Sequence, residues 1–222
     1  AQAAALEGQP GVTLRPDFRE IRLHRRTVAT GGAARAAAEA YDPARPLRLV
    51  QFAAPPSDAD LDGLRAAGAR LVHYVPHNAW IVWVPSIEAA ARVESLTVAR
   101  PGSTRLQYHG AFRPLDAVQP SLDPARSAPE FVDVTIQLFN EPAAAKADLA
   151  AIAGDALAVL TPPREALRGQ YVNVTGRVRG TEIDALSQLK SVVAVIPDVE
   201  PQLHGELQSQ TMAMNLNAAG TG

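Results

Sequence analysis

Hydrophobic and polar residues alternate over Phe131–Phe139, which is the clearest periodic pattern in the chain. The hydrophobic positions of one parity in this run are Val132, Val134, Ile136 and Leu138. Because successive side chains of a strand point to opposite faces, the run predicts a strand with one buried and one mainly polar face. Other hydrophobic runs predict strands over residues 18–24, 47–52, 71–75, 79–84, 156–160, 171–178 and 192–196.

Apolar residues at helical spacing lie between several of these strands. Ser57 is a suitable N-cap for a first helix, because its hydroxyl can accept a hydrogen bond from a free amide of the first turn. Gly68 is a suitable C-terminal stop for the same helix. Three more helices are predicted to begin at or near Ile87, Pro142 and Thr181.

The order strand–helix–strand–strand–helix–strand occurs twice along the chain. It predicts an α+β protein of two tandem ferredoxin-like (βαββαβ) plaits, each an antiparallel sheet covered on one face by two helices. A stretch rich in Pro, Ser and Asp separates the two copies. We assign a lead-in segment to residues 1–45, the first unit to 46–115, a linker to 116–129, the second unit to 130–204 and a C-terminal connector to 205–222.

Each sheet is then expected to have one face without helices. In the second unit this face would carry polar residues together with Phe and Tyr: Phe131, Asp133, Thr135, Gln137, Phe139, Tyr171, Asn173 and Thr175. Such a mixture suits a surface that a protein partner covers for part of the time. The same residues also fit an ordinary solvated face, or a face on which the two units pack against each other.

The composition narrows the functional classes. The chain has 222 residues, a formal net charge of −2 and 47% hydrophobic residues, which is ordinary for a folded protein and argues against a general nucleic-acid-binding function. No apolar run is long enough to predict a membrane span. The absence of cysteine excludes disulfides, thiolate zinc sites and a thiol nucleophile. The small residues at 1–5 resemble those around a signal-peptidase site and suggest a secreted or periplasmic protein, although an Ala-rich disordered end would look the same.

Side chains that could carry chemistry are dispersed along the chain. The five histidines are His24, His73, His77, His109 and His204. His73 and His77 are four residues apart, but Pro76 argues against the helix that would bring them together as metal ligands. No Gly-x-Ser-x-Gly motif, Walker lysine loop or Gly-x-Gly-x-x-Gly motif occurs. We therefore expect no catalytic residue, no metal site and no cofactor, and a chain that acts by binding.

Several stretches in a fixed order carry a resemblance to a known family. They are 48–52 (RLVQF), 67–82 (AGARLVHYVPHNAWIV), 107–114 (QYHGAFRP), 186–198 (LSQLKSVVAVIPD) and 208–222. Together they resemble the N-terminal prodomain of subtilisin-like serine proteases, of the long tandem type found in bacteria. The last stretch is similar to the connector that precedes the protease domain in this family.

The resemblance implies two linked roles. As an intramolecular folding chaperone, the chain would dock a sheet face on two surface helices of the subtilisin-like catalytic domain of the same precursor, whose non-local strand pairing makes folding slow. As an inhibitor in cis, it would place its C-terminal segment in the substrate cleft as an added β-strand. The residues around the cleavage point would be Ala218, Ala219, Gly220, Thr221 and Gly222. Met214 and residues 204–207 depart from the family pattern and leave the cleavage point open, and the tail alone equally fits a flexible linker.

The catalytic motifs of that family are absent: no Asp-Ser/Thr-Gly, His-Gly-Thr or Gly-Thr-Ser sequence occurs. The resemblance therefore implies the non-catalytic part of a serine endopeptidase precursor rather than an enzyme. One alternative is a stand-alone tandem ferredoxin-like regulatory or ligand-binding module, which usually has a glycine in the turn after the first strand; residues 53–56 and 140–142 lack it. Another is an acylphosphatase-like hydrolase, which would need an arginine in that loop, and neither unit has one.

Overall fold

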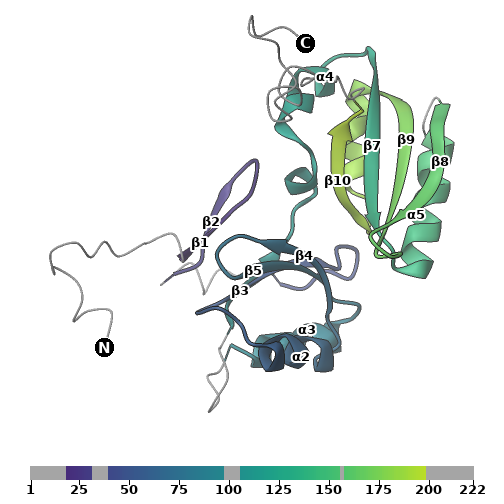
Figure 1. Ribbon diagram of the computed structural model, residues 1–222. Helices are drawn as coiled ribbons and strands as arrows, with labels where there is room; N and C mark the ends of the chain where they lie inside the picture. The colour runs from purple at the N-terminus through teal and green to yellow at the C-terminus, as the bar shows by residue number, and fades with distance from the viewer. Residues whose placement is uncertain (1–18, 32–39, 98–105, 156–157, 199–222) are drawn as a thin grey trace, which may run out of the picture.

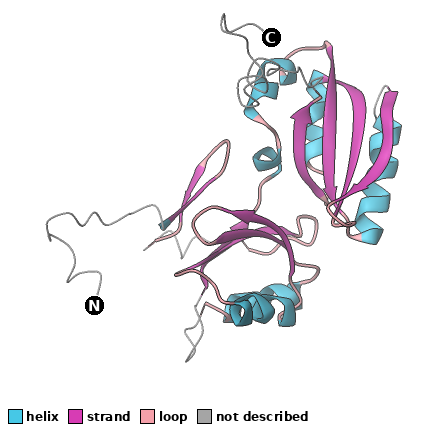
Figure 2. Ribbon diagram, viewed as in Figure 1, coloured by secondary structure: helices cyan, strands magenta, loops and turns pink. Residues whose placement is uncertain are grey.

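The computed structural model describes residues 19–31, 40–97, 106–155 and 158–198 and has an α+β architecture (Figure 1). It contains two four-stranded antiparallel sheets and a two-stranded hairpin. In each unit the two main helices lie on the same side of the four-stranded sheet (Figure 2). The predicted fold, two tandem ferredoxin-like plaits, is confirmed.

The first unit consists of β3 (Leu47–Phe52), α2 (Asp58–Ala66), β4 (Arg70–Val75), β5 (Ala79–Trp83), α3 (Ile87–Ser95) and β6 (Leu106–Ala111). Its strand order is β4–β5–β3–β6, and every neighbouring pair is antiparallel. Val50 and Val82 of the sheet are buried in one cluster with Leu64 of α2 and Val93 of α3. These contacts hold both helices on one face of the sheet.

Local sequence signals set the ends of these elements. The Ser57 hydroxyl accepts a hydrogen bond from the Asp60 amide, and the Asp60 carboxylate accepts one from the Ser57 amide. The predicted N-cap is therefore confirmed as a capping box. Gly68, the predicted stop, has a φ of 92°. The three-residue turn between β4 and β5 places His77 (φ 68°) and Asn78 (φ 60°) in the left-handed region.

The second unit consists of β7 (Phe131–Phe139), α5 (Pro142–Asp155), β8 (Ala158–Ala166), β9 (Tyr171–Arg179), η5 (Gly180–Glu182), α6 (Ile183–Ser187) and β10 (Val192–Pro197). Its strand order, β10–β7–β9–β8, repeats that of the first sheet. The prediction that Thr181 caps the last helix is wrong, because Thr181 lies inside the 3-10 turn η5 and α6 begins at Ile183. Strand β8 extends beyond the predicted residue 160 through Pro162 and Pro163, which an edge strand tolerates.

The N-terminal lead-in contributes a hairpin of β1 (Glu20–Arg22) and β2 (Thr27–Ala29). Ile21 and Val28 of this hairpin are buried in the same hydrophobic cluster as Leu49 and Trp83 of the first sheet. The cluster also contains Phe139 of the second unit. The expectation of an uncovered face is therefore wrong for the first sheet, because the hairpin and the second unit cover its helix-free side.

The side-chain amide of Gln51, on β3, forms hydrogen bonds between the first sheet and the hairpin segment. This side chain is fully buried. Its nitrogen donates hydrogen bonds to the backbone oxygens of Glu20 (3.1 Å) and His77 (2.9 Å). Its oxygen accepts hydrogen bonds from the Thr30 hydroxyl (2.5 Å) and the Gln107 amide (2.7 Å). A buried polar group with this many partners fixes the position of the hairpin on the sheet.

The segment predicted as a linker, 116–129, is folded in its first part. It carries the second half of η3 (Pro114–Ala117) and the whole of η4 (Pro120–Leu122) and α4 (Asp123–Arg126). Val118 forms a parallel bridge with Val195 of β10, and the Gln119 amide donates a 2.9 Å hydrogen bond to the Val195 oxygen. Val118 and Leu122 are buried. The segment therefore packs along the outer edge of the second sheet, because it carries apolar residues among its prolines and serines.

Candidate functional site

The helix-free face of the second sheet is built mainly from β7 and β9, which pair residue for residue along their whole lengths. Asp133 lies opposite Arg177, whose guanidinium donates hydrogen bonds of 2.6 and 2.7 Å to the carboxylate. This contact lowers the pKa of Asp133 and raises the pKa of Arg177. The Asp133 side chain is 31% exposed, so an ionised acid is held in a fixed position at the surface.

Two further polar pairs continue this ladder along the face. The hydroxyls of Thr135 and Thr175 form a 3.1 Å hydrogen bond. The Gln137 side-chain nitrogen donates a 3.1 Å hydrogen bond to the Asn173 side-chain oxygen. All four residues are partly exposed. Cross-strand pairs of this kind order the side chains before any partner arrives, while hydroxyl and amide groups keep capacity for further hydrogen bonds.

One end of this face is open to solvent. Phe131 is 45% exposed, and the guanidinium of Arg179 lies 5.0 Å from the centre of its ring. The last described residue, Asp198, lies beside the same end, where its backbone amide donates a 2.9 Å hydrogen bond to the backbone oxygen of Asp133. The Thr135 hydroxyl donates to the Asp198 carboxylate over 3.1 Å. The chain therefore leaves the second unit next to the open end of the face.

The other end of the face is closed by the first unit. Phe139 and Tyr171 lie opposite each other, and each is only 2% exposed. The rings of Phe139 and Trp83 have their centres 5.8 Å apart, and the Arg70 guanidinium lies 4.7 Å from the Phe139 ring. The Tyr171 hydroxyl donates a hydrogen bond to the Val72 oxygen, and burial raises the pKa of Tyr171. These two predicted partner-binding residues therefore lie in the contact between the units.

The structure thus brings the predicted face residues together but divides them between two environments. Those that remain at the surface are Phe131, Asp133, Thr135, Gln137, Asn173 and Thr175. Alternation alone could not predict this division, because all eight residues share one parity and the contact comes from a different unit. The predicted cleavage region, residues 218–222, lies outside the described residues.

A cleft of about 530 Å³ lies between the two units, and none of the features predicted from the sequence corresponds to it. Its lining combines the hairpin turn, β4 and β5 of the first sheet, the segment after β6, and β10 of the second sheet. Residues far apart in the sequence meet here, for example Ile81 and Ile196. No motif of consecutive residues could reveal such a site.

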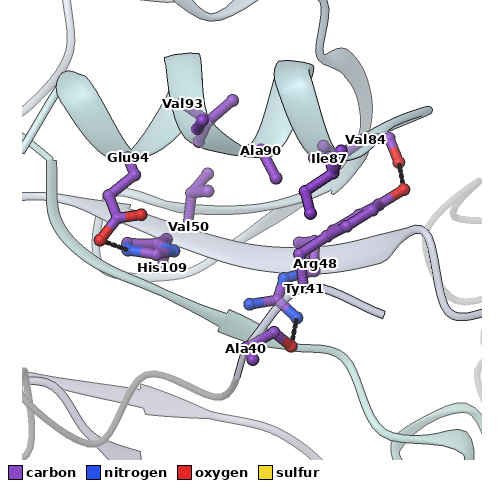
Figure 3. A pocket seen from close by; sticks show the side chains of 11 residues that line it. Ala40, Tyr41, Arg48, Val50, Val84, Ile87, Ala90, Val93, Glu94 and His109 are labelled. Atoms are coloured by element: carbon purple, nitrogen blue, oxygen red, sulfur yellow. Dashed lines mark hydrogen bonds and ion pairs between the residues drawn. The ribbon is translucent and has the colours of Figure 1, made fainter. Parts of the chain in front are cut away.

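A second cavity, of about 330 Å³, lies between α3 and strands β3 and β6 of the first unit (Figure 3). Arg48, which is 5% exposed, donates a 3.3 Å hydrogen bond to the Ala40 oxygen at its floor. The Tyr41 hydroxyl donates a 2.8 Å hydrogen bond to the Val84 oxygen. Ile87, Ala90 and Val93 of α3 line the cavity with apolar side chains, while Arg48 of β3, Glu94 of α3 and His109 of β6 line it with ionisable ones.

Histidines and acidic residues are the side chains of this chain that could bind a metal ion. His73 lies on β4 and His77 in the following turn, so they do not share a helix. Within residues 19–31, 40–97, 106–155 and 158–198, no group of three or more His, Asp or Glu side chains could hold a metal ion. No helix in the same ranges has the length and apolar character needed to cross a bilayer.

Residues 20–105 match the family described as "Domain of unknown function (DUF8729)". The match begins at β1 and ends just before β6, so the matched range includes both the N-terminal hairpin and most of the first unit. The packing of Ile21 and Val28 on the first sheet likewise places the hairpin with this unit. The chain matches no curated protein and no solved structure. The matched range leaves out the second unit and carries no functional description.

Proposed function

We propose that the chain is the prodomain of a secreted subtilisin-like serine protease, and that it assists folding of the catalytic domain and inhibits it. The resemblance of the ordered sequence stretches suggests the family. The observation that carries the proposal is the position of the open face relative to Asp198, the last described residue; the open face consists of Phe131, Asp133, Thr135, Gln137, Asn173 and Thr175. Asp198 contacts Asp133 and Thr135 at one end of this face, and the C-terminal tail follows it in the sequence.

The chemistry of the open face suits contact with helix ends on a protein partner. The positive end of a helix favours carboxylates and other hydrogen-bond acceptors. Asp133 supplies an ionised carboxylate, and Thr135 and Asn173 supply further acceptors on the same face. Phe131 adds an exposed aromatic ring at the rim, a residue type that is enriched in interfaces.

The length of the tail suits an inhibitory segment that reaches a cleft beside the docked face. Residues 199–222 follow Asp198, and an extended chain advances about 3.3 Å per residue. If fully extended, a tail of this length would reach tens of ångströms, enough to bind the edge of a substrate cleft as an added strand. Its last residues, Ala219 and Gly220 among them, are small and suit a narrow groove.

The proposal is tested by inhibition of the subtilisin-like protease encoded by the same reading frame. Purified residues 1–222 should inhibit that protease in trans, and deletion of 208–222 should weaken inhibition strongly. Thr175→Arg, in the middle of the open face, should also weaken it. Thr27→Arg, an exposed threonine of β2, is the matched control and should have no effect.

Two results would contradict the proposal. A stop codon after residue 222 would remove the protease from the precursor. Equal inhibition by the intact chain, the tail deletion and Thr175→Arg would remove both the tail and the face from the mechanism.

A second candidate function is a stand-alone regulatory module that binds a small molecule. The cleft between the two units favours it, because contacts between domains are a common place for such sites. This function predicts binding of a ligand without any protease, which separates it from the first proposal.

A further inference from the structure

The cleft between the units has apolar walls contributed by both sheets. Val75 and Ile81 come from the first sheet, Val193 and Ile196 from β10, and Phe112 from the segment after β6. Its volume, about 530 Å³, lies within the range of sites that hold small organic molecules. The cleft therefore has room for an apolar ligand body between the two sheets.

One large apolar side chain of this cleft remains exposed. Ile196 of β10 is 40% exposed, whereas the ring of Tyr74 packs against Trp80 on the helix-covered side of the first sheet. Most other apolar residues of its lining, such as Phe112 at 6%, are buried against the protein. An exposed apolar surface next to a preformed cleft is typical of a binding site, because a ligand there removes the surface from water.

The polar lining of the cleft is predominantly basic in type. Its rim carries Arg22 and His24 from the hairpin and His73 from β4, and all three are exposed. The Arg22 guanidinium also donates a 2.6 Å hydrogen bond to the Glu20 carboxylate, which compensates part of its charge. Asp116, the acid of the lining, is buried and accepts two 2.7 Å hydrogen bonds from the Arg26 guanidinium. The negative charge of Asp116 is therefore compensated from outside the cleft, while the rim offers N–H donors.

We propose that this cleft binds an amphipathic carboxylate, with its acyl chain between the two sheets and its carboxylate at the rim formed by Arg22, His24 and His73. The N–H donors of the rim select the head group, and the apolar walls select the chain. The site adjoins the open face, because Gln137 of that face lines the cleft and Ile196 is the cross-strand partner of Thr135. A binding measurement without a protease tests it independently of the protease role. Ligand binding there stabilises the contact between the two units.

The probe for this proposal is decanoate, used below its micelle concentration with the full chain labelled for NMR. The amides of Ile81 and Ala194, on opposite walls, should shift saturably with a dissociation constant of about 0.1 mM. Decylamine and decanol have the same chain with a cationic or a neutral head. They should bind about tenfold more weakly, since they lack the carboxylate.

Two matched variants locate the site. Ile196→Asp places a negative charge in the cleft, and Leu160→Asp makes the same change at a similarly exposed residue of β8, outside it. Ile196→Asp should weaken decanoate binding at least about tenfold, and Leu160→Asp should leave it unchanged. The combined change Arg22→Gln and His73→Gln should weaken decanoate binding but not decanol binding.

Several outcomes would overturn the proposal. They are the absence of saturable shifts up to about 1 mM decanoate, equal binding of decylamine, and equal binding by Ile196→Asp. Shifts confined to the α3 cavity would place the ligand elsewhere. If raising the protein concentration alone reproduced the shifts, the occupant would be a second copy of the chain.

Discussion

The hydroxyl of Tyr171 donates a hydrogen bond to the backbone oxygen of Val72, which joins the second sheet to an edge strand of the first. The Gln170 side chain donates to the same oxygen over 2.7 Å. Together these contacts extend the joint between the units beyond the packing of Phe139 on Trp83. The two plaits are therefore held by specific hydrogen bonds as well as by apolar contact.

Replacement of Tyr171 by Phe is expected to weaken this joint moderately. The Val72 oxygen keeps its bond from Gln170, so the loss should be about 1 kcal/mol, the usual net worth of one hydrogen bond. Urea denaturation of the variant measures the loss. Tyr74→Phe, at a half-exposed tyrosine, serves as the control and should unfold as the unchanged chain does. Equal stability of the two variants would show that the Tyr171 hydroxyl adds nothing.

The Asp133–Arg177 pair predicts a pH dependence. Because Arg177 lowers the pKa of Asp133, the folded state binds a proton at this carboxylate less readily than the unfolded state does. The pair therefore contributes stability above the ordinary pKa of an aspartate, about 4, and the contribution is lost as the pH falls through the lowered pKa. Since the pair is exposed, the effect should be small.

The measurement for this pair is an NMR titration of the Asp133 carboxyl in the unchanged chain and in Arg177→Gln. The variant should titrate at a higher pH and lose less stability on acidification. Arg164→Gln, on the neighbouring edge strand, is the control and should leave the Asp133 titration in place. An unchanged titration in Arg177→Gln would contradict the assigned cause.

Replacement of Gln51 by Leu should detach the N-terminal hairpin. Leucine fills a similar volume but leaves the Glu20 oxygen and the Thr30 hydroxyl without the buried amide they contact. A buried polar group left without a partner costs about 1–3 kcal/mol. Hydrogen exchange should therefore speed up over β1 and β2 more than over the second sheet. Uniform acceleration in both sheets would argue against a local role, and Thr27→Ala provides an exposed control.

The folded connection between the units can be tested at Leu122. This side chain is 2% exposed, so Leu122→Ala should lower the free energy of unfolding by about 2–4 kcal/mol. Ser121→Ala, at the exposed neighbour, should have almost no effect. If both variants unfolded at the same urea concentration, the segment would be a flexible linker after all.

The periodic patterns predicted the elements well where one face of a strand is buried within its own unit. Phe131–Phe139 is such a case, and its bounds match the structure. The patterns predicted the burial of a side chain poorly where the residues that cover it belong to the other unit. Phe139 and Tyr171 share the parity of Thr135 and Thr175, yet only the aromatic pair lies under the first unit. Long-range contact, rather than local periodicity, decides that difference.

The folded segment 116–129 and the cleft between the units could not be predicted from local sequence patterns, because both depend on long-range contacts. Val118 becomes part of a strand-like contact only because β10 offers Val195 at its edge. The cleft exists only because residues of both units, such as Ile81 and Ile196, line the same space. The subtilisin-like relationship stays a prediction, since the family match covers residues 20–105 alone and names no activity.

The hairpin that covers the first sheet precedes that sheet in the chain, and this order has a consequence during synthesis. Every strand from β1 to β6 lies within residues 20–111, so the first half can complete its own core while the second half is still being translated. The surface formed by Trp83 and Val72 then exists before Phe139 and Tyr171 emerge from the ribosome. We expect the second half to fold against this surface of the already folded N-terminal half. We also expect the second half alone to be prone to aggregation.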